Sequence, residues 1–318
     1  MKKKLLVITP IEHIAGLLEK LESKFEVTLV PDPTFNQIRQ YLEHVNVVYT
    51  NPNKSKLPID RKFMEASPNL EQIVTASTGT IHIDVRHAEE IGISVISLTR
   101  EYSTINKISS TAEHAVALTF ALLRNLYPAI NDVSAGIWDY EKFIGRQMNA
   151  LTVGVIGYGR LGKMYARFME VFGAEILICD PFLDPDTCPY PLMDKETLFV
   201  RSNIISLHVH ANEENLKMID DVTLNFAKSD VMIVNTARGE VVDEEAMVQF
   251  LKKNPKAKLA TDVLADELEN KWKSPLLGYF KAGNESQLTI TPHIGGMSRE
   301  AQEIAYHRVA DLLLARSS

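Results

Sequence analysis

The sequence predicts an α/β protein with two doubly wound parallel sheets, each in a domain of its own. Short β-branched runs alternate with amphipathic helical patterns along nearly the whole chain, and this alternation is typical of parallel sheets covered by helices. The 318 residues also exceed the size at which one hydrophobic core usually stops growing. With 45% hydrophobic and 24% charged residues, the composition is that of an ordinary globular protein.

The first hundred residues contain five short runs rich in valine, isoleucine and leucine, which we expect to be strands. Between them, residues 11–21 and 35–42 have the apolar spacing of amphipathic helices. This alternation predicts a doubly wound parallel sheet covered by helices. The expected strands are residues 5–8, 25–30, 45–49, 72–75 and 93–96.

A long apolar pattern at residues 109–128 predicts a crossover helix, and Ser109, Ser110 and Thr111 at its start are typical capping residues. A second alternating block follows and predicts a Rossmann-type sheet. The closing helical pattern at 298–314 comes after the last strand and is expected to return to the first domain. The expected strands of the second block are residues 151–156, 175–179, 203–207, 231–235, 258–261 and 287–290.

Composition and charge argue against several classes of partner. The net charge is −7 with no long basic run, so a nucleic-acid surface has little electrostatic support and a small-molecule ligand is favoured. No segment approaches the ~18 consecutive apolar residues of a membrane helix. The apolar run before Pro10 is too short for an export signal. Cys179 and Cys188 form no disulfide framework, so a cytoplasmic location is expected.

The glycine motif at residues 151–162 predicts a dinucleotide site. Gly157 permits a tight turn and Gly159 allows the backbone to approach a pyrophosphate, while Gly162 lets helix and strand pack closely. The free N–H groups of a helix that starts near Arg160 would then face the anion. A β-branched strand precedes the motif and an amphipathic helix follows it, which is the context such a site requires.

Asp180 indicates which dinucleotide is bound. It ends the strand that follows the glycine motif and lies 18 residues after Gly162. A carboxylate at this place accepts hydrogen bonds from the adenine ribose 2′-OH and repels a 2′-phosphate. Pro181 and Phe182 follow, with no arginine or lysine nearby to hold a phosphate, so NAD is favoured over NADP.

Three segments farther along, residues 234–243, 261–267 and 291–296, resemble the D-isomer-specific 2-hydroxyacid dehydrogenase family in sequence, order and spacing. The resemblance covers nearly the whole chain. It implies a 2-keto or 2-hydroxy acid substrate and NAD as cofactor. It also implies a flavodoxin-like substrate domain at 1–107, completed by the C-terminal helix 297–318, and a Rossmann NAD-binding domain at 108–296.

The residues of these segments suit the reduction of a 2-keto acid. Arg238 offers a planar fork for bidentate binding of a carboxylate, and one of its donors can polarise the keto group. His293 can gain and lose a proton near neutral pH. Glu267 would favour the imidazolium form and orient the ring. Arg238, Glu267 and His293 are therefore the expected catalytic residues.

The resemblance implies further binding residues. Asp262 would hold the nicotinamide carboxamide, and backbone N–H groups near Thr78 and Gly79 would take the substrate carboxylate, with Ser77 where many members have glycine. Residues 126–138 would form a dimer arm, so a homodimer is expected. The complete set expected to bind the cofactor is Gly157, Gly159, Arg160, Leu161, Gly162, Asp180, His208, Thr236, Ala237 and Asp262.

Three places depart from the family's patterns, whereas His114 lies in a segment that matches them. His208 and His210 alternate at a strand end, but no carboxylate or thiol follows at ligand spacing, so no metal is expected. His114 is interpreted as a surface or packing residue. The loop at 51–54 lacks the arginine that phosphoglycerate enzymes tend to use for phosphate, and Lys107 stands where the family usually has asparagine.

Other functions on this fold stay open at this point. NAD(H)-sensing corepressors resemble the family and keep the same arginine, glutamate and histidine, but they usually add disordered tails that this chain lacks. Formate dehydrogenases pair the catalytic histidine with glutamine, which Glu267 argues against. The residues leave open which acid is the substrate and in which direction the reaction runs.

Overall fold

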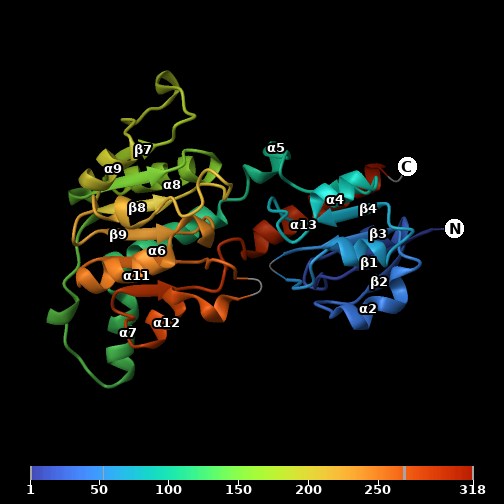
Figure 1. Ribbon diagram of the computed structural model, residues 1–318, viewed down its shortest axis with the longest axis horizontal. Helices are drawn as coiled ribbons and strands as arrows, with labels where there is room; N and C mark the ends of the chain where they lie inside the picture. Colours follow the sequence, from blue (N-terminus) through green and yellow to red (C-terminus); the bar gives the residue numbers. More distant parts are fainter. Residues whose placement is uncertain (1, 53, 268–269, 317–318) are drawn as a thin grey trace. The chain divides into compact units, whose positions relative to one another are not determined.

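The computed structural model describes residues 2–316 apart from residues 53, 268 and 269. Its contacts divide the chain into two compact units (Figure 1). Unit 1 consists of Met1–Ile108 and Met297–Ser318, and unit 2 consists of Ser109–Gly296. Each unit holds one sheet of parallel strands with helices packed on it, so the predicted fold class is confirmed.

The sheet of unit 1 has five parallel strands in the order β2-β1-β3-β4-β5, which is the flavodoxin-like order. Successive side chains of a strand point to opposite sides, and the inner strands β1, β3 and β4 are largely buried on both faces, whereas the edge strands β2 and β5 are only partly buried. Leu5 and Val7 of β1 join one core, whereas Leu6 and Ile8 join the other. The strands are β1 Lys3–Val7, β2 Phe25–Leu29, β3 Val47–Thr50, β4 Gln72–Thr75 and β5 Ser94–Ile96.

The C-terminal helix packs on one face of this sheet together with α1. Tyr306 is fully buried there, and its carbonyl accepts a hydrogen bond of 2.8 Å from the Tyr49 hydroxyl. The helix expected at 11–21 is shorter than predicted, because Gly16 adopts a left-handed φ of 71° just before its first turn. The helices are α1 Leu17–Glu22, α2 Phe35–Leu42, α3 Arg61–Glu65, α4 Val85–Glu90, α5 Tyr102–Ile105 and α13 Arg299–Arg316.

The sheet of unit 2 has six parallel strands in the order β11-β10-β9-β8-β6-β7. The chain moves from β6 outward to β7 and then crosses back to β8, so the order reverses between β6 and β8. Ligands bind at such switch points in open α/β sheets. Outside β7, a single parallel bridge joins Ile178 to Leu192, because Pro189 and Pro191 lack the N–H groups that a longer strand needs. The strands are β6 Thr152–Ile156, β7 Glu175–Cys179, β8 Ile204–Leu207, β9 Met232–Asn235, β10 Lys258–Thr261 and β11 Leu288–Ile290.

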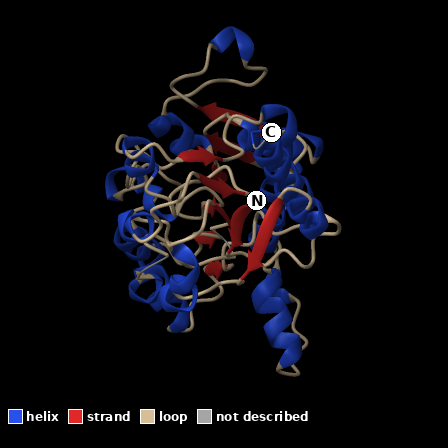
Figure 2. Ribbon diagram, turned by 90° about the vertical axis from the view of Figure 1, so that its right-hand side faces the viewer, coloured by secondary structure: helices blue, strands red, loops and turns tan. Residues whose placement is uncertain are grey.

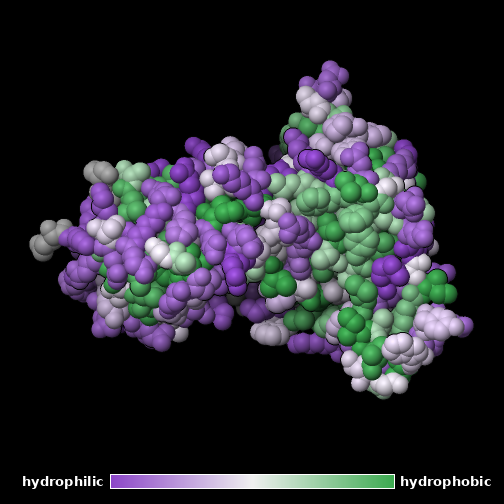
Figure 3. Space-filling view, turned by 180° about the vertical axis from the view of Figure 1, so that it is seen from behind, coloured by the Kyte–Doolittle hydropathy of each residue, from purple (hydrophilic) through white to green (hydrophobic). Residues whose placement is uncertain are grey.

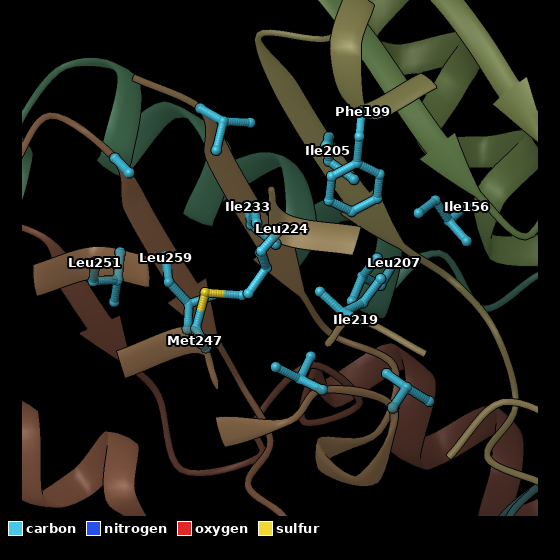
Figure 4. Close-up of a cluster of buried hydrophobic side chains, with 14 of the residues drawn as sticks. Ile156, Phe199, Ile205, Leu207, Ile219, Leu224, Ile233, Met247, Leu251 and Leu259 are labelled. Carbon is cyan, nitrogen blue, oxygen red and sulfur yellow. The ribbon is translucent and has the colours of Figure 1, made fainter. Parts of the chain in front are cut away.

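Two cores sandwich this second sheet. One combines alternate strand residues with α6 and α8, and the other, drawn in Figure 4, combines the opposite set with α9, α10 and α11. Ile233 and Leu259 of the sheet face Met247 and Leu251 of α11 in that core. The helices are α6 Ser110–Leu123, α7 Leu126–Ser134, α8 Arg160–Val171, α9 Lys195–Arg201, α10 Asp221–Leu224, α11 Glu244–Lys253 and α12 Pro275–Lys281.

The single helix predicted over residues 109–128 is wrong, because two helices occupy and extend beyond this range. Asn125 adopts a left-handed φ of 53° and ends α6 before α7 begins. Pro128 falls in the first turn of α7, where its missing N–H costs nothing. This second helix projects from the rest of unit 2 at the bottom of Figures 1 and 2. Within the described part of the chain, no helix is long and apolar enough to cross a membrane.

Candidate active site

Three of the expected site residues follow three neighbouring strands of unit 2. Arg238 comes after β9, Glu267 after β10 and His293 after β11, and these strands pair in parallel side by side. The carboxyl ends of parallel strands meet at one edge, where adjacent strands lie about 4.8 Å apart. The fold therefore brings a guanidinium, a carboxylate and an imidazole to one edge of the sheet.

His293 and Glu267 are in direct contact. Nδ1 of His293 forms a short hydrogen bond with Oε1 of Glu267, and Oε2 of Glu267 accepts the Leu264 N–H at 3.3 Å. The side chains of His293 and Glu267 are 29% and 21% exposed, so the pair remains open on one side. With Nδ1 taken by the carboxylate, Nε2 is the nitrogen left to exchange a proton with a ligand.

The backbone is strained at His293 and at the residue next to Glu267. His293 has a φ of 57°, and Asp266, next to Glu267, has a φ of 52°. Such left-handed conformations outside glycine cost about 1–3 kcal/mol each and cluster at functional sites. They persist only when the surroundings hold them in place. This loop geometry is therefore specified by contacts elsewhere in unit 2.

Asp262 supplies those contacts on the His293 side. Its carboxylate is 2% exposed and accepts hydrogen bonds from the N–H groups of Ile294 and Gly295 at 2.9 and 2.7 Å, and from the Thr291 hydroxyl at 2.6 Å. Burial alone would raise the pKa of Asp262, but the hydrogen bonds from His114, Thr291 and the two N–H groups outweigh it and lower the pKa. An ionised Asp262 thus holds the segment that carries His293.

His114 was missed as part of this arrangement. Its Nε2 lies 3.0 Å from the Thr291 hydroxyl and 3.3 Å from Oδ1 of Asp262. The sequence shows that His114 lies in a helical segment. It does not show which residues distant in the sequence contact the His114 side chain. The structure places His114 on α6, in contact with the loop that holds His293.

The loop of Arg238 is held by Asn235. The Asn235 amide donates to the Arg238 carbonyl at 2.9 Å and accepts the Ala237 N–H at 3.0 Å. Nη1 of Arg238 donates to the Ala237 carbonyl at 2.6 Å. A guanidinium has five N–H donors, so most of them stay available for an anion.

Gly239 fits the Arg238 loop tightly against the Glu267 loop. A Cβ atom added at Gly239 would lie 2.0 Å from the Leu264 carbonyl carbon and 2.1 Å from the Ala265 nitrogen. Oε1 of Glu244 accepts the Ala265 N–H at 2.8 Å from the same side. Burial raises the pKa of Glu244, although its hydrogen bonds to Ser274 and Ala265 oppose the shift. The sequence did not indicate that Gly239 and Glu244 support the site, because both contact residues that are distant in the sequence.

The glycine motif meets the steric demands of a bound pyrophosphate. Gly157 has a φ of 87°, and a Cβ at Gly162 would lie 2.0 Å from the Gly157 carbonyl oxygen. By contrast, a Cβ at Gly159 would meet nothing within 4 Å, so this backbone faces open space. Helix α8 begins directly after Gly159 and has no side-chain cap, and the N-terminus of a helix favours an anion. Arg160 and Leu161 are its first two residues.

Other expected cofactor residues lie at the same edge. Asp180 directly follows β7 and accepts the N–H groups of Tyr158 at 2.8 Å and Phe182 at 3.0 Å. Thr236, after β9, has a buried hydroxyl without a hydrogen-bond partner among the described residues, as expected where a ligand supplies the partner. Burial lowers the pKa of His208 to about 3, so this imidazole is neutral. These features fit a dinucleotide.

The expected carboxylate loop belongs to unit 1. The Gly79 N–H donates to the Ser77 hydroxyl at 3.0 Å, and the Thr78 carbonyl accepts from the Thr99 hydroxyl at 2.8 Å. A carboxylate would therefore compete with Ser77 for the Gly79 N–H. Within the described ranges, no group of three or more His, Cys, Asp or Glu side chains is arranged to hold a metal ion.

Comparison with known proteins identifies the family of this chain. The model of the family described as D-isomer specific 2-hydroxyacid dehydrogenase, NAD binding domain, matches residues 116–295. This chain belongs to the D-isomer-specific 2-hydroxyacid dehydrogenase family. The residues matched by the model of the NAD-binding domain all lie within unit 2. The family resemblance stated from the sequence is confirmed.

The proteins similar to this chain in sequence include several dehydrogenases. The D-3-phosphoglycerate dehydrogenase of Mycobacterium leprae is 33% identical over 261 residues, which is 81% of this chain and 47% of that protein. The chain thus spans about half the length of the first such relatives. The glycerate dehydrogenase of Methylorubrum extorquens is 31% identical over 91% of this chain and 86% of that protein.

Solved structures of the family also resemble this one. A D-lactate dehydrogenase from Aquifex aeolicus, complexed with NAD and lactic acid, is 25% identical with a TM-score of 0.83 and covers 99% of this chain and 95% of that chain. A glyoxylate reductase from Paecilomyes thermophila is 27% identical with a TM-score of 0.83, covering 100% and 96%. These relatives are oxidoreductases, so the corepressor alternative is not favoured.

Proposed function

We propose that this chain interconverts a D-2-hydroxy acid and the corresponding 2-keto acid, with NAD as the hydride carrier. The contact between His293 and Glu267, one strand away from Arg238, carries this proposal. The edge of the sheet then holds the two functions that keto-acid reduction needs, a fork for a carboxylate and a proton donor beside it.

The roles of the residues follow from their contacts. Bound NADH supplies the hydride. The guanidinium of Arg238 binds the carboxylate and polarises the keto group, and Nε2 of His293 donates the proton to the carbonyl oxygen. Glu267 stabilises the imidazolium and orients the ring through Nδ1. In the direction of oxidation, the same imidazole accepts the proton.

Binding roles are divided between the two units in this proposal. Unit 2 is the NAD-binding domain, in which Gly157, Gly159, Gly162 and the start of α8 hold the pyrophosphate and Asp180 binds the adenine ribose. The cofactor site is completed by the Thr236 hydroxyl, which has no partner among the described residues, and by Ala237, His208 and Asp262. Unit 1 is the substrate domain and contributes the Thr78–Gly79 loop.

Two substitutions test the roles of Arg238 and His293, because they should change different kinetic constants. Arg238→Ala should raise KM and lower kcat, because the arginine acts in recognition and in polarisation. His293→Asn should leave NADH binding nearly intact but lower kcat roughly 10²–10⁴-fold, as for a lost general acid. Steady-state kinetics across 2-keto acids of graded size, with NADH titrations by fluorescence, provide both measurements.

Matched controls replace the exposed Arg167 by Ala and the exposed His44 by Asn. Both should behave like the wild type. The proposed catalytic roles are refuted if His293→Asn turns over as fast as His44→Asn, and the proposed activity is refuted if no 2-keto acid supports NADH oxidation.

We further propose a homodimer formed through α7 and the residues after it. None of the nine residues of α7 is buried, although the helix is apolar on one side. Ile130, Val133 and Trp138 are 61%, 56% and 86% exposed. Figure 3 displays hydrophobic side chains gathered over this face of unit 2 and its projecting corner. Exposed apolar patches of this kind mark association surfaces.

We also propose a cytoplasmic location. Cys179 and Cys188 are both free thiols, as is usual in a reducing compartment. Cell fractionation with antibodies against this chain would test it, and recovery outside the cytoplasmic fraction would refute it.

A further inference from the structure

One buried carboxylate of α11 contacts the segment that carries Glu267. Glu244 is the first residue of α11 and is 7% exposed. Its Oε1 accepts the Ala265 N–H at 2.8 Å, and its Oε2 accepts the Ser274 hydroxyl at 2.5 Å. The same carboxylate accepts the Leu276 N–H. One side chain thus holds the chain on both sides of Glu267.

The cap of α11 does not depend on the Glu244 side chain. Asp243 precedes the helix, and one oxygen of its carboxylate accepts the N–H groups of Glu245 and Ala246, both at 3.1 Å. The Glu244 side chain instead reaches residues 21 and 30 positions farther along the chain. Its hydrogen bonds therefore serve the segment that carries Glu267 and not its own helix.

The free energy of burial argues against a role of Glu244 in stability alone. Removing a carboxylate from water is costly, and burial raises the pKa of Glu244 in spite of its hydrogen bonds. The negative charge of Glu240, on the preceding turn, raises that pKa further. A buried apolar side chain of similar size would avoid these costs. What the carboxylate adds is an acceptor for three donors that it fixes in place.

The hydrogen bond from Ala265 lies directly before a strained turn. Glu267 comes two residues after Ala265, and Asp266 between them has a left-handed φ of 52°. Such a backbone persists only where neighbouring contacts fix it, and the bond from Ala265 to Glu244 is one such contact. A shift of this turn would move the Glu267 carboxylate away from Nδ1 of His293.

We propose that Glu244 is a positioning residue for proton transfer, which holds the chain on both sides of Glu267 so that the Glu267 carboxylate stays on Nδ1 of His293. Its role is indirect, because its hydrogen bonds go to this segment and not to His293 or the Glu267 side chain. The inference rests on the proposed function, because it takes His293 as the proton donor.

A double-mutant cycle tests this indirect role. Glu244→Leu is similar in size but removes both acceptor oxygens, so the N–H groups of Ala265 and Leu276 lose their partner and the segment shifts. With the 2-keto acid that the wild type reduces fastest, kcat should fall roughly 10–100-fold, as for a misplaced catalytic group, and KM should change little. In a Glu267→Ala background, the same substitution should change kcat by no more than about 2-fold, because Glu244 acts through Glu267.

Three further variants complete the test. Glu244→Gln keeps an oxygen that can accept the Ala265 N–H, so its kcat should stay well above that of Glu244→Leu. Ser274→Ala removes only one of the three donors and should lower kcat in the same direction by a smaller factor, so it provides the cycle where Glu244→Leu does not fold. Glu245→Leu is the matched control, because Glu245 is the next residue of α11 and is exposed. It should behave like the wild type.

Hydrogen–deuterium exchange followed by mass spectrometry gives a readout independent of turnover. Peptides that contain Ala265 or Leu276 should exchange faster in Glu244→Leu than in the wild type and in Glu245→Leu. The inference is overturned if this exchange is unchanged, if the loss of kcat is the same in both backgrounds, or if Glu244→Gln loses as much as Glu244→Leu. A wild type that reduces no 2-keto acid would instead refute the proposed function, and the exchange experiment would still decide whether Glu244 holds the segment.

Discussion

In the proposed cofactor site, the choice between NAD and NADP depends on one carboxylate, that of Asp180. It lies at the end of β7 and also accepts the N–H of Tyr158 in the glycine motif. Asp180→Asn removes the charge and keeps an acceptor, so the NADH to NADPH ratio of kcat/KM should fall roughly 10–100-fold. A cofactor competition assay measures it, with the exposed Asp186→Asn as control. Equal use of NADPH by the wild type would contradict the preference for NAD.

His82 predicts a dependence of stability on pH. It is 5% exposed, and burial lowers its pKa to about 4, with Nε2 3.1 Å from the Thr75 hydroxyl. Because the unfolded chain binds this proton more readily, the stabilising effect of a neutral His82 is complete above its ordinary pKa of about 6.5 and decreases as pH falls toward 4. When the pH is lowered from 7.5 to 5, protonation of His82 in the unfolded chain should lower the unfolding free energy by about 2 kcal/mol.

Urea denaturation of His82→Gln tests this effect, because the amide nitrogen of glutamine can replace Nε2. Its unfolding free energy should fall less than that of the wild type between the two pH values. The exposed His44→Gln should follow the wild type. Parallel losses in all three proteins would show that His82 does not carry the effect.

At the scale of elements, the packing of the Arg238 loop on the Glu267 loop depends on Gly239. Gly239→Ala would force a Cβ into the backbone of Leu264 and Ala265, so we expect a loss of about 3 kcal/mol in unfolding free energy. Activity should fall roughly 10²-fold, because the loops of two site residues would be displaced. Thermal denaturation and steady-state kinetics measure the two effects.

Gly278 provides the matched control for this substitution. It is exposed in α12 and a Cβ there would meet nothing within 4 Å. Gly278→Ala should therefore stabilise the protein by up to about 1 kcal/mol without changing kcat. If Gly239→Ala were as stable and active as Gly278→Ala, the close approach of the two loops would be wrong.

At the scale of the whole molecule, the exposed apolar surface of α7 predicts association. A variant with Ile130→Asp and Trp138→Asp should be monomeric where the wild type is a dimer, because two charges cannot be buried without partners. Multi-angle light scattering at micromolar concentration measures the mass. Replacing the exposed Phe182 by Asp, elsewhere on unit 2, is the control. A monomeric wild type would refute the dimer.

Sequence reasoning succeeded where the signal is local. β-Branched runs identified the eleven strands of the described residues, with every strand end predicted to within two residues, and the glycine motif marked the turn between β6 and α8. It failed where local patterns compete: one continuous apolar pattern hid the break at Asn125, and the pattern before Gly16 resembled a helix that the backbone does not form.

By itself, the sequence determined the α/β class, the family and the residue types expected at the site, because periodicity, turn chemistry and motifs are properties of short segments. Only the tertiary structure decided which of these residues touch. The contact of His293 with Glu267, the ties of Asp262 to Thr291 and His114, and the close approach of Gly239 to Leu264 all depend on which strands are neighbours. Strand order results from packing along the whole chain, and no short segment encodes it.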